Sequence, residues 1–241
     1  MNDDIVSAIR SKKKSSMRLA VNAVKNKEAN ACVSAGNTGA LMALSKIILK
    51  TIPGIDRPAI CGSLPTKTSQ FHMLDLGANV ECSAKHLYEF AIMGSALVQS
   101  LNLKTKPVIG LLNIGSEDFK GNETIKTAGQ LIQKSNLNYA GFVEGDDMFN
   151  GKFDVIVTDG FAGNIALKSI EGVAKVISHF IKKEFTKNIF TKLSALISLP
   201  VMKSFKNKVD PRKYNGASLL GLQGIVVKSH GGADSLAFSQ A

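Results

Sequence analysis

One plan recurs four times along this 241-residue chain: an apolar run, a loop of small polar residues and an amphipathic helix. The apolar runs occupy residues 31–33, 73–76, 108–112 and 155–158. The helices that follow them are expected at 40–50 and 84–101, and in two further stretches that end at about residues 134 and 183. A further strand is expected at 224–227. Strand–loop–helix units of this length build a parallel sheet whose loops collect along one edge. We therefore predict an α/β fold, a three-layer Rossmann-like parallel sheet with its ligand at that edge.

The first loop, Ser34-Ala-Gly-Asn-Thr-Gly39, is the strongest single indication of a ligand. Glycine lets the backbone approach an anion closely, and the N–H groups of Gly36, Asn37 and Gly39 at a helix start are expected to face it, with Thr38 as the cap. The loop is neither a Walker A loop nor a GxGxxG fingerprint, and alone it is a weak signal, because small loops before helices are often only turns. Similar loops occur at 77–79, 113–121 and 159–164. Together they favour a shared site for phosphate or another oxyanion.

Several charged side chains lie near the ends of these loops and strands. Lys120, Lys168 and Lys228 are able to neutralise phosphate charge, although a solvated surface is the more common place for a lysine. His230, between Ser229 and two glycines, suits proton transfer because histidine titrates near neutral pH, and a structural role explains it as well. Asp159 is expected to cap the helix that follows it.

Other features of the composition exclude several classes of protein. Cys32, Cys61 and Cys82 are odd in number and widely spaced, which favours reduced thiols over disulfides or a zinc cluster. With four histidines, no HxxxH pattern and no acidic cluster, the sequence predicts no metal and no nucleotide cofactor. The start of the chain lacks the pattern of a secretion signal, and no apolar run reaches the roughly 20 residues that span a bilayer. We predict a cytoplasmic or surface-bound protein.

The net charge of +11 is concentrated in residues 181–213, which hold nine basic and two acidic side chains. A basic segment suits an anionic membrane, an acidic protein or nucleic acid. Few aromatic residues accompany these lysines, so a nucleic-acid partner is not predicted.

Within this basic segment, residues 187–208 are predicted to form two helical stretches around Ser198-Leu199-Pro200, because proline disfavours helix in the residue before it. The apolar positions of this hairpin are Leu193, Leu196, Ile197, Leu199 and Val201. Because lysines flank them, these side chains are suited to a membrane interface. Packing on the core or on a second subunit explains them equally well.

Nine ordered motifs of the chain resemble the PlsX-type phosphate acyltransferases. They are Arg10 to Met17, Ser34 to Leu41, Gly54 to Pro58, Asp75 to Val80, Ala91 to Ser95, Leu111 to Gly115, Asp159 to Asn164, Tyr214 to Ala217 and Lys228 to Gly231. The resemblance runs from about Ile9 to Phe238 and implies a fold similar to isocitrate and isopropylmalate dehydrogenases and to phosphotransacetylase, with a protruding helical hairpin.

The resemblance implies transfer of a fatty acyl group from acyl carrier protein to inorganic phosphate, giving acyl phosphate for glycerophospholipid synthesis without a cofactor. It implies a homodimer at the inner face of an anionic membrane, near the downstream glycerol-3-phosphate acyltransferase. Lys168 and His230 are then the expected charge or proton partners in catalysis. The expected substrate and phosphate ligands are Ser34, Gly36, Asn37, Thr38, Gly39, Asn79, Asn113, Gly115, Lys120, Asp159, Gly160 and Asn164.

The chain departs from this family at both ends. It lacks the family's upstream Asp-Ala-Met-Gly-Gly-Asp loop and its longer final helix, so residues 1–241 are expected to be a partial phosphate acyltransferase domain. This predicts little or no activity for the chain by itself. The alternatives are an inactive remnant and a phosphotransacetylase-like enzyme that uses acyl-coenzyme A, which has no need of the basic apolar hairpin.

Overall fold

The computed structural model describes residues 12–241, apart from the side chains at 206, 208, 209 and 211, so residues 10 and 11 of the first motif lie outside it. Eight strands form one sheet in the order β1-β8-β7-β2-β3-β6-β4-β5. The strands are β1 (Ala31–Ser34), β2 (Ala59–Pro65), β3 (Gln70–Leu74), β4 (Ile109–Leu112), β5 (Tyr139–Val143), β6 (Val155–Val157), β7 (Ala217–Leu220) and β8 (Ile225–Lys228). The predicted strands are present, and β2, β5 and β7 are additional.

The sheet is mixed, so the prediction of a wholly parallel sheet is wrong. Strand β2 pairs antiparallel with both of its neighbours, β3 and β7, and β7 pairs antiparallel with β8. Strands β3, β6, β4 and β5 are parallel to one another, and β1 is parallel to β8. It follows that β1 and β8 run opposite to β3, β6 and β4. The carboxyl ends of the two groups lie at opposite edges, and the four loops do not collect along one edge.

A tight hairpin between β2 and β3 supplies one of the three antiparallel pairings that together produce this reversal. The Thr66 N–H donates to the Ser69 carbonyl at 2.8 Å, and the Thr66 hydroxyl oxygen accepts the Ser69 N–H at 2.8 Å. A turn this short can only join antiparallel strands, whereas parallel neighbours need a longer crossover. The strand–loop–helix plan contains no such hairpin, which is why the pattern predicted one strand direction.

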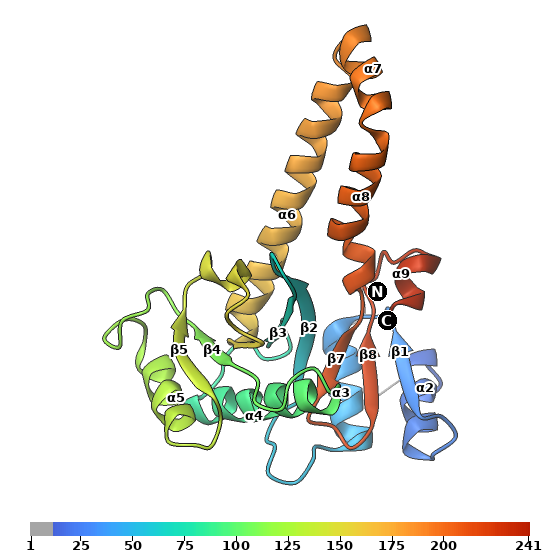
Figure 1. Cartoon of the computed structure of the whole chain (residues 1–241). Helices are drawn as coiled ribbons and strands as arrows, with labels where there is room; N and C mark the ends of the chain where they lie inside the picture. The colour runs from blue at the N-terminus through green and yellow to red at the C-terminus, as the bar shows by residue number, and fades with distance from the viewer. Residues whose placement is uncertain (1–11) are drawn as a thin grey trace.

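Helices cover both faces of the sheet and give the predicted three layers (Figure 1). They are α2 (Ser16–Lys25), α3 (Thr38–Leu49), α4 (Ala84–Ser100), α5 (Glu123–Gln133), α6 (Gly160–Phe185), α7 (Ile189–Ile197), α8 (Leu199–Val209) and α9 (Ser235–Ser239), with 3-10 turns η1 (Asp147–Asn150) and η2 (Pro211–Tyr214). Residues of α2, α3 and the start of α6 pack with Phe71 and Ile156 on one face. Residues of α4 and α5 pack with Val155 and Val157 on the other. Successive strand residues alternate between the two cores, as a pleated strand requires.

Helices α6, α7 and α8 form an arm that projects from the body (Figure 1). The two predicted stretches are α7 and α8, which meet at Ser198, and Pro200 lies in the first turn of α8, where its missing N–H costs nothing. The outer part of α6 forms the other limb, so the arm is larger than residues 187–208. Within residues 12–241, no helix is long and apolar enough to cross a membrane.

Candidate functional site

The start of α3 carries the loop that the sequence singled out. Asn37 caps this helix, because its Oδ1 accepts the Ala40 N–H at 3.0 Å. Thr38 is the first helical residue, so its predicted role as the cap is corrected. The Ser34 hydroxyl oxygen accepts the Gly36 N–H at 3.2 Å and bends the chain away from β1. Asparagine and serine hold short loops in this way because their side chains hydrogen-bond to nearby backbone groups.

The first turn of α3 offers free hydrogen-bond donors. Within the described part of the chain, the backbone N–H groups of Asn37, Thr38 and Gly39 make no hydrogen bond. The first N–H groups of a helix have no partner in the helix, and the helix dipole makes this end partly positive. Asn37 is exposed, and Thr38 and Gly39 are half-buried, so an anion can reach this turn from solvent.

Two lysines add positive charge beside this loop. Strand β8 pairs with β1 so that Lys228 lies opposite Ser34, and the Ser229 N–H donates to the Ser34 carbonyl at 3.0 Å. The half-buried Lys228 ammonium donates to the Ser229 carbonyl. Burial lowers the pKa of Lys228, and the charge on Lys168 lowers it further. Lys168 of α6 is therefore close enough to act on Lys228. A bound anion near Lys228 offsets repulsion of this kind.

The loop after β8 carries His230, and its hydrogen bonds bring in Asn215, a residue that the sequence did not single out. The Asn215 Oδ1 accepts the His230 N–H at 2.9 Å, and its Nδ2 donates to the Ser229 hydroxyl oxygen at 2.8 Å. Asn215 belongs to the Tyr214 to Ala217 motif, which was the available signal. Its partners lie 14 and 15 residues further along the chain, so the contacts require the fold.

At the opposite edge of the sheet, the Asp75–Asn79 loop packs against the start of α6. Asn79 is 3% exposed, and its Nδ2 donates to the Pro58 carbonyl and to Asp75 Oδ2, each at 2.9 Å. The Asn79 N–H also donates to Asp75 Oδ2, and its carbonyl accepts the Gly160 N–H. All donors of Asn79 and the N–H of Gly160 are used within the protein. Their predicted role as phosphate ligands is corrected to a structural one.

The other predicted ligands at this edge also have partners within the chain. Asn113 closes its own loop, since Nδ2 donates to the Lys120 carbonyl at 3.2 Å and Oδ1 accepts the Ile114 N–H at 2.9 Å. The Lys120 ammonium lies 5.7 Å from the Phe119 ring centroid. Asp159 caps α6 by accepting the Ala162 N–H at 2.7 Å, which confirms its predicted capping role.

Two further predicted ligands at this edge are explained by packing. Gly115 is buried, and a Cβ there would lie 2.9 Å from the Lys120 side chain. Asn164 lies against Gly77, where an added Cβ would lie 3.4 Å from the Asn164 side chain. Much of this edge is therefore a packed junction, although the exposed Asn164 amide has no hydrogen-bond partner within residues 12–241.

None of the three cysteines has the features of a catalytic nucleophile. Cys32 and Cys61 are buried, and burial raises the pKa of the partly exposed Cys82 thiol to about 12. A nucleophilic cysteine needs a lowered pKa, so these thiols are inert.

The family model described as fatty acid synthesis protein matches residues 1–241. The chain belongs to this family. The phosphate acyltransferase of Methylococcus capsulatus is 58% identical over 241 residues, which cover all of this chain and 71% of that protein. The phosphate acyltransferase of Vesicomyosocius okutanii is 59% identical over 241 residues, with the same shares.

Solved structures confirm the predicted fold class. The EutD phosphotransacetylase from Staphylococcus aureus superposes with a TM-score of 0.60 at 16% identity, over 93% of this chain and 64% of that one. A phosphotransacetylase from Streptococcus pyogenes gives a TM-score of 0.62 at 17% identity, over 92% and 64%. At these identities the comparison concerns the fold alone.

Proposed function

We propose that this acyltransferase moves a fatty acyl group from acyl carrier protein to inorganic phosphate, giving acyl phosphate for phospholipid synthesis. The observation that carries the proposal is the cradle, which we define as the three free N–H groups of Asn37, Thr38 and Gly39 together with Lys168 and Lys228. Donors and fixed positive charge of this kind suit a phosphate dianion. The names of the relatives, phosphate acyltransferase, support the same reaction.

In this reaction a phosphate oxygen attacks the thioester carbonyl carbon, and the carbonyl becomes a tetrahedral oxyanion. The oxyanion then collapses, the C–S bond breaks and the carrier leaves as a thiolate. A thiolate is a good leaving group, so the step places little demand on a general acid. The cradle has two tasks, which are to hold the phosphate in place and to reduce its charge repulsion with the developing oxyanion.

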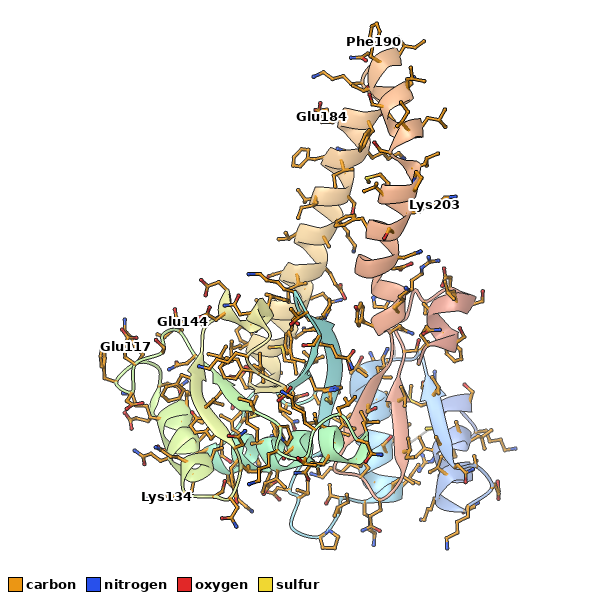
Figure 2. The ribbon with its side chains drawn as sticks, viewed as in Figure 1. Glu117, Lys134, Glu144, Glu184, Phe190 and Lys203 are labelled. Atoms are coloured by element: carbon orange, nitrogen blue, oxygen red, sulfur yellow. The ribbon has the colours of Figure 1, made fainter. Side chains whose placement is uncertain are left out.

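Charge removal at the cradle tests the proposal. Replacing Lys228 by Gln should raise the Kd for inorganic phosphate roughly ten- to a hundredfold, because a charge-assisted hydrogen bond to a phosphate oxygen is worth about 1.5–3 kcal/mol. Lys168→Gln should have a smaller effect, since Lys168 is more exposed and also pairs with Glu171 at 3.2 Å. The control is Lys134→Gln, at the end of α5 on the far side of the body (Figure 2). Titration calorimetry showing equal Kd values for all three variants would remove these lysines from the site.

The acyl donor is tested separately, because the structural neighbours include phosphotransacetylases. The basic arm suits an acidic carrier protein, which associates faster with a complementary surface. We expect kcat/KM to be higher with acyl carrier protein than with acyl-coenzyme A, and this preference to shrink as salt is added. A preference for acyl-coenzyme A at low salt would favour the phosphotransacetylase-like alternative. Absence of turnover with both donors would favour the predicted inactivity of the chain by itself.

We also propose that the arm binds the inner face of an anionic membrane. Its predicted apolar residues are all exposed: Leu193, Leu196, Ile197, Leu199 and Val201. Phe190 at the outer end of the arm is 79% exposed, and Lys203 lies on the α8 limb (Figure 2). The other limb carries Lys182 and Lys183 in the last turn of α6. Apolar side chains beside lysines give interfacial binding that depends on anionic lipid. A second copy of the chain, as in the predicted homodimer, is the competing occupant.

A double substitution on α7 distinguishes the two occupants. Leu196→Glu with Ile197→Glu should abolish sedimentation with vesicles of anionic phospholipid and leave the circular dichroism spectrum unchanged. The matched control, Gln130→Glu with Gln133→Glu, adds the same charge on α5 of the body and should still bind. Should the arm variant keep binding vesicles but sediment as a smaller particle in the ultracentrifuge, the arm is a subunit contact.

A further inference from the structure

The imidazole of His230 is held in one tautomer by the backbone. The Gly232 N–H lies 3.0 Å from His230 Nδ1. A backbone N–H can only donate, so Nδ1 must carry a lone pair, and in the neutral ring the proton is on Nε2. His230 is exposed, and within residues 12–241 its Nε2 has no hydrogen-bond partner. The ring thus presents an N–H donor to solvent, one residue after Ser229, whose N–H donates to the Ser34 carbonyl.

Asn215 fixes the backbone that carries this ring. Its side chain makes three hydrogen bonds: it accepts the His230 N–H at 2.9 Å and donates to the Ser229 hydroxyl oxygen at 2.8 Å and to the Ala237 carbonyl at 2.7 Å. Ser229 is fully buried, and its N–H donates to the Ser34 carbonyl. One amide therefore joins the loop after β8 to α9, and Ser229 continues the connection to the cradle.

The backbone beside Asn215 leaves it little freedom. Gly216 has a φ of +102°, a conformation that side chains rarely adopt, and a Cβ there would lie 2.6 Å from the Ala241 Cα. The chain turns sharply at Gly216 into β7, so Asn215 is held at the base of the loop. Its acceptor and one donor meet neighbouring residues of the loop after β8, and its other donor meets α9, an arrangement that a shorter or charged side chain cannot reproduce.

We propose that Asn215 is a positioning residue which, together with Gly232, holds His230 as the Nε2–H tautomer, so that His230 donates a hydrogen bond to a phosphate oxygen in the cradle. The proposal rests on the proposed function. It changes the role predicted for His230 from proton transfer to hydrogen-bond donation. The chemistry agrees, because a phosphate dianion needs no base to become a nucleophile, whereas its charge needs donors.

The tautomer is measured in the free protein, without any substrate. In a two-bond proton–nitrogen NMR spectrum at neutral pH, His230 should show a pyridine-like Nδ1 and a pyrrole-like Nε2, and its signals are assigned by their loss in His230→Gln. Asn215→Ala should give a mixture of tautomers, whereas Asn138→Ala, which removes an exposed amide at the far side of the sheet, should not. A protonated Nδ1 or a mixture in the wild type overturns the proposal, whatever the protein's reaction.

Phosphate titrations then test the donor role. Glutamine can place an amide N–H near the position of Nε2–H, and alanine cannot. Unlike histidine, glutamine cannot relay a proton. We expect His230→Ala to raise the Kd for inorganic phosphate about tenfold and His230→Gln to raise it less than about threefold. Equal weakening by both variants rules out the donor role. Absence of phosphate binding in the wild type contradicts the proposed function instead, and leaves the tautomer measurement standing.

Discussion

Replacing Gly163 by Ala should destabilise the protein, although alanine is the better helix former. Gly163 lies in the first turn of α6 and is buried, and a Cβ there would overlap the Asp75 carbonyl oxygen and lie 2.9 Å from Thr158 Cγ2. A backbone oxygen cannot rotate away, so α6 or the Asp75 loop must shift. Overpacking of this kind costs about 3 kcal/mol, and the gain in helix propensity returns about 1 kcal/mol.

The expected net loss is about 2 kcal/mol, which lowers Tm by about 4 to 8 °C in a chain of this size. Gly172 provides the matched control, because it lies in the same helix with no atom within 4 Å of an added Cβ. Gly172→Ala should therefore raise the free energy of unfolding by up to about 1 kcal/mol. Urea unfolding followed by circular dichroism measures both variants. If Gly163→Ala is as stable as Gly172→Ala, the packing argument for the start of α6 is refuted.

Two other changes follow from the described contacts. Burial lowers the pKa of His72, so the folded chain takes up a proton there less readily than the unfolded chain does. The free energy of unfolding should therefore fall as the pH drops below about 6.5. Urea midpoints at about pH 7.5 and about pH 5.5 measure this loss, and His72→Gln should reduce the difference between them. Asn37→Ala should cost about 1 kcal/mol by removing the cap of α3, whereas Asn37→Ser, whose hydroxyl can accept the Ala40 N–H, should keep most of the stability in a thermal scan.

The sequence was informative where structure is local. The predicted strands, the helices predicted after four of them and the two helical stretches of the hairpin are present, because apolar periodicity and loop composition are properties of neighbouring residues. The direction of β1 relative to β3 was not predictable in this way, since it depends on the β2–β3 hairpin and on the pairing of β7, both outside the repeated plan.

In the candidate site too, local features were predictable from the sequence and contacts between distant segments were not. The loop at 34–39 was found because its glycines and polar residues precede a helix, and the structure leaves its donors free. The motif at 159–164 looks the same in sequence, but there the missing side chains allow close packing on Asp75 and Asn79. Glycine serves both purposes for one reason, the absence of a Cβ, so composition cannot distinguish an anion loop from a packed junction. Asn215 was missed because its partners are distant in sequence.

The packed junction still matters for the site, because α6 connects the two edges of the sheet. This helix begins against the Asp75–Asn79 loop, where Gly160 and Gly163 leave no space for a side chain. Lys168 follows Gly160 by eight positions, about 12 Å along the helix axis at 1.5 Å per residue. A helix is stiff over that distance, so the position of Lys168 beside Lys228 is set by how its first turn packs. On the proposed function, Gly160 and Gly163 support the cradle through the packing of α6 and need not contact the anion.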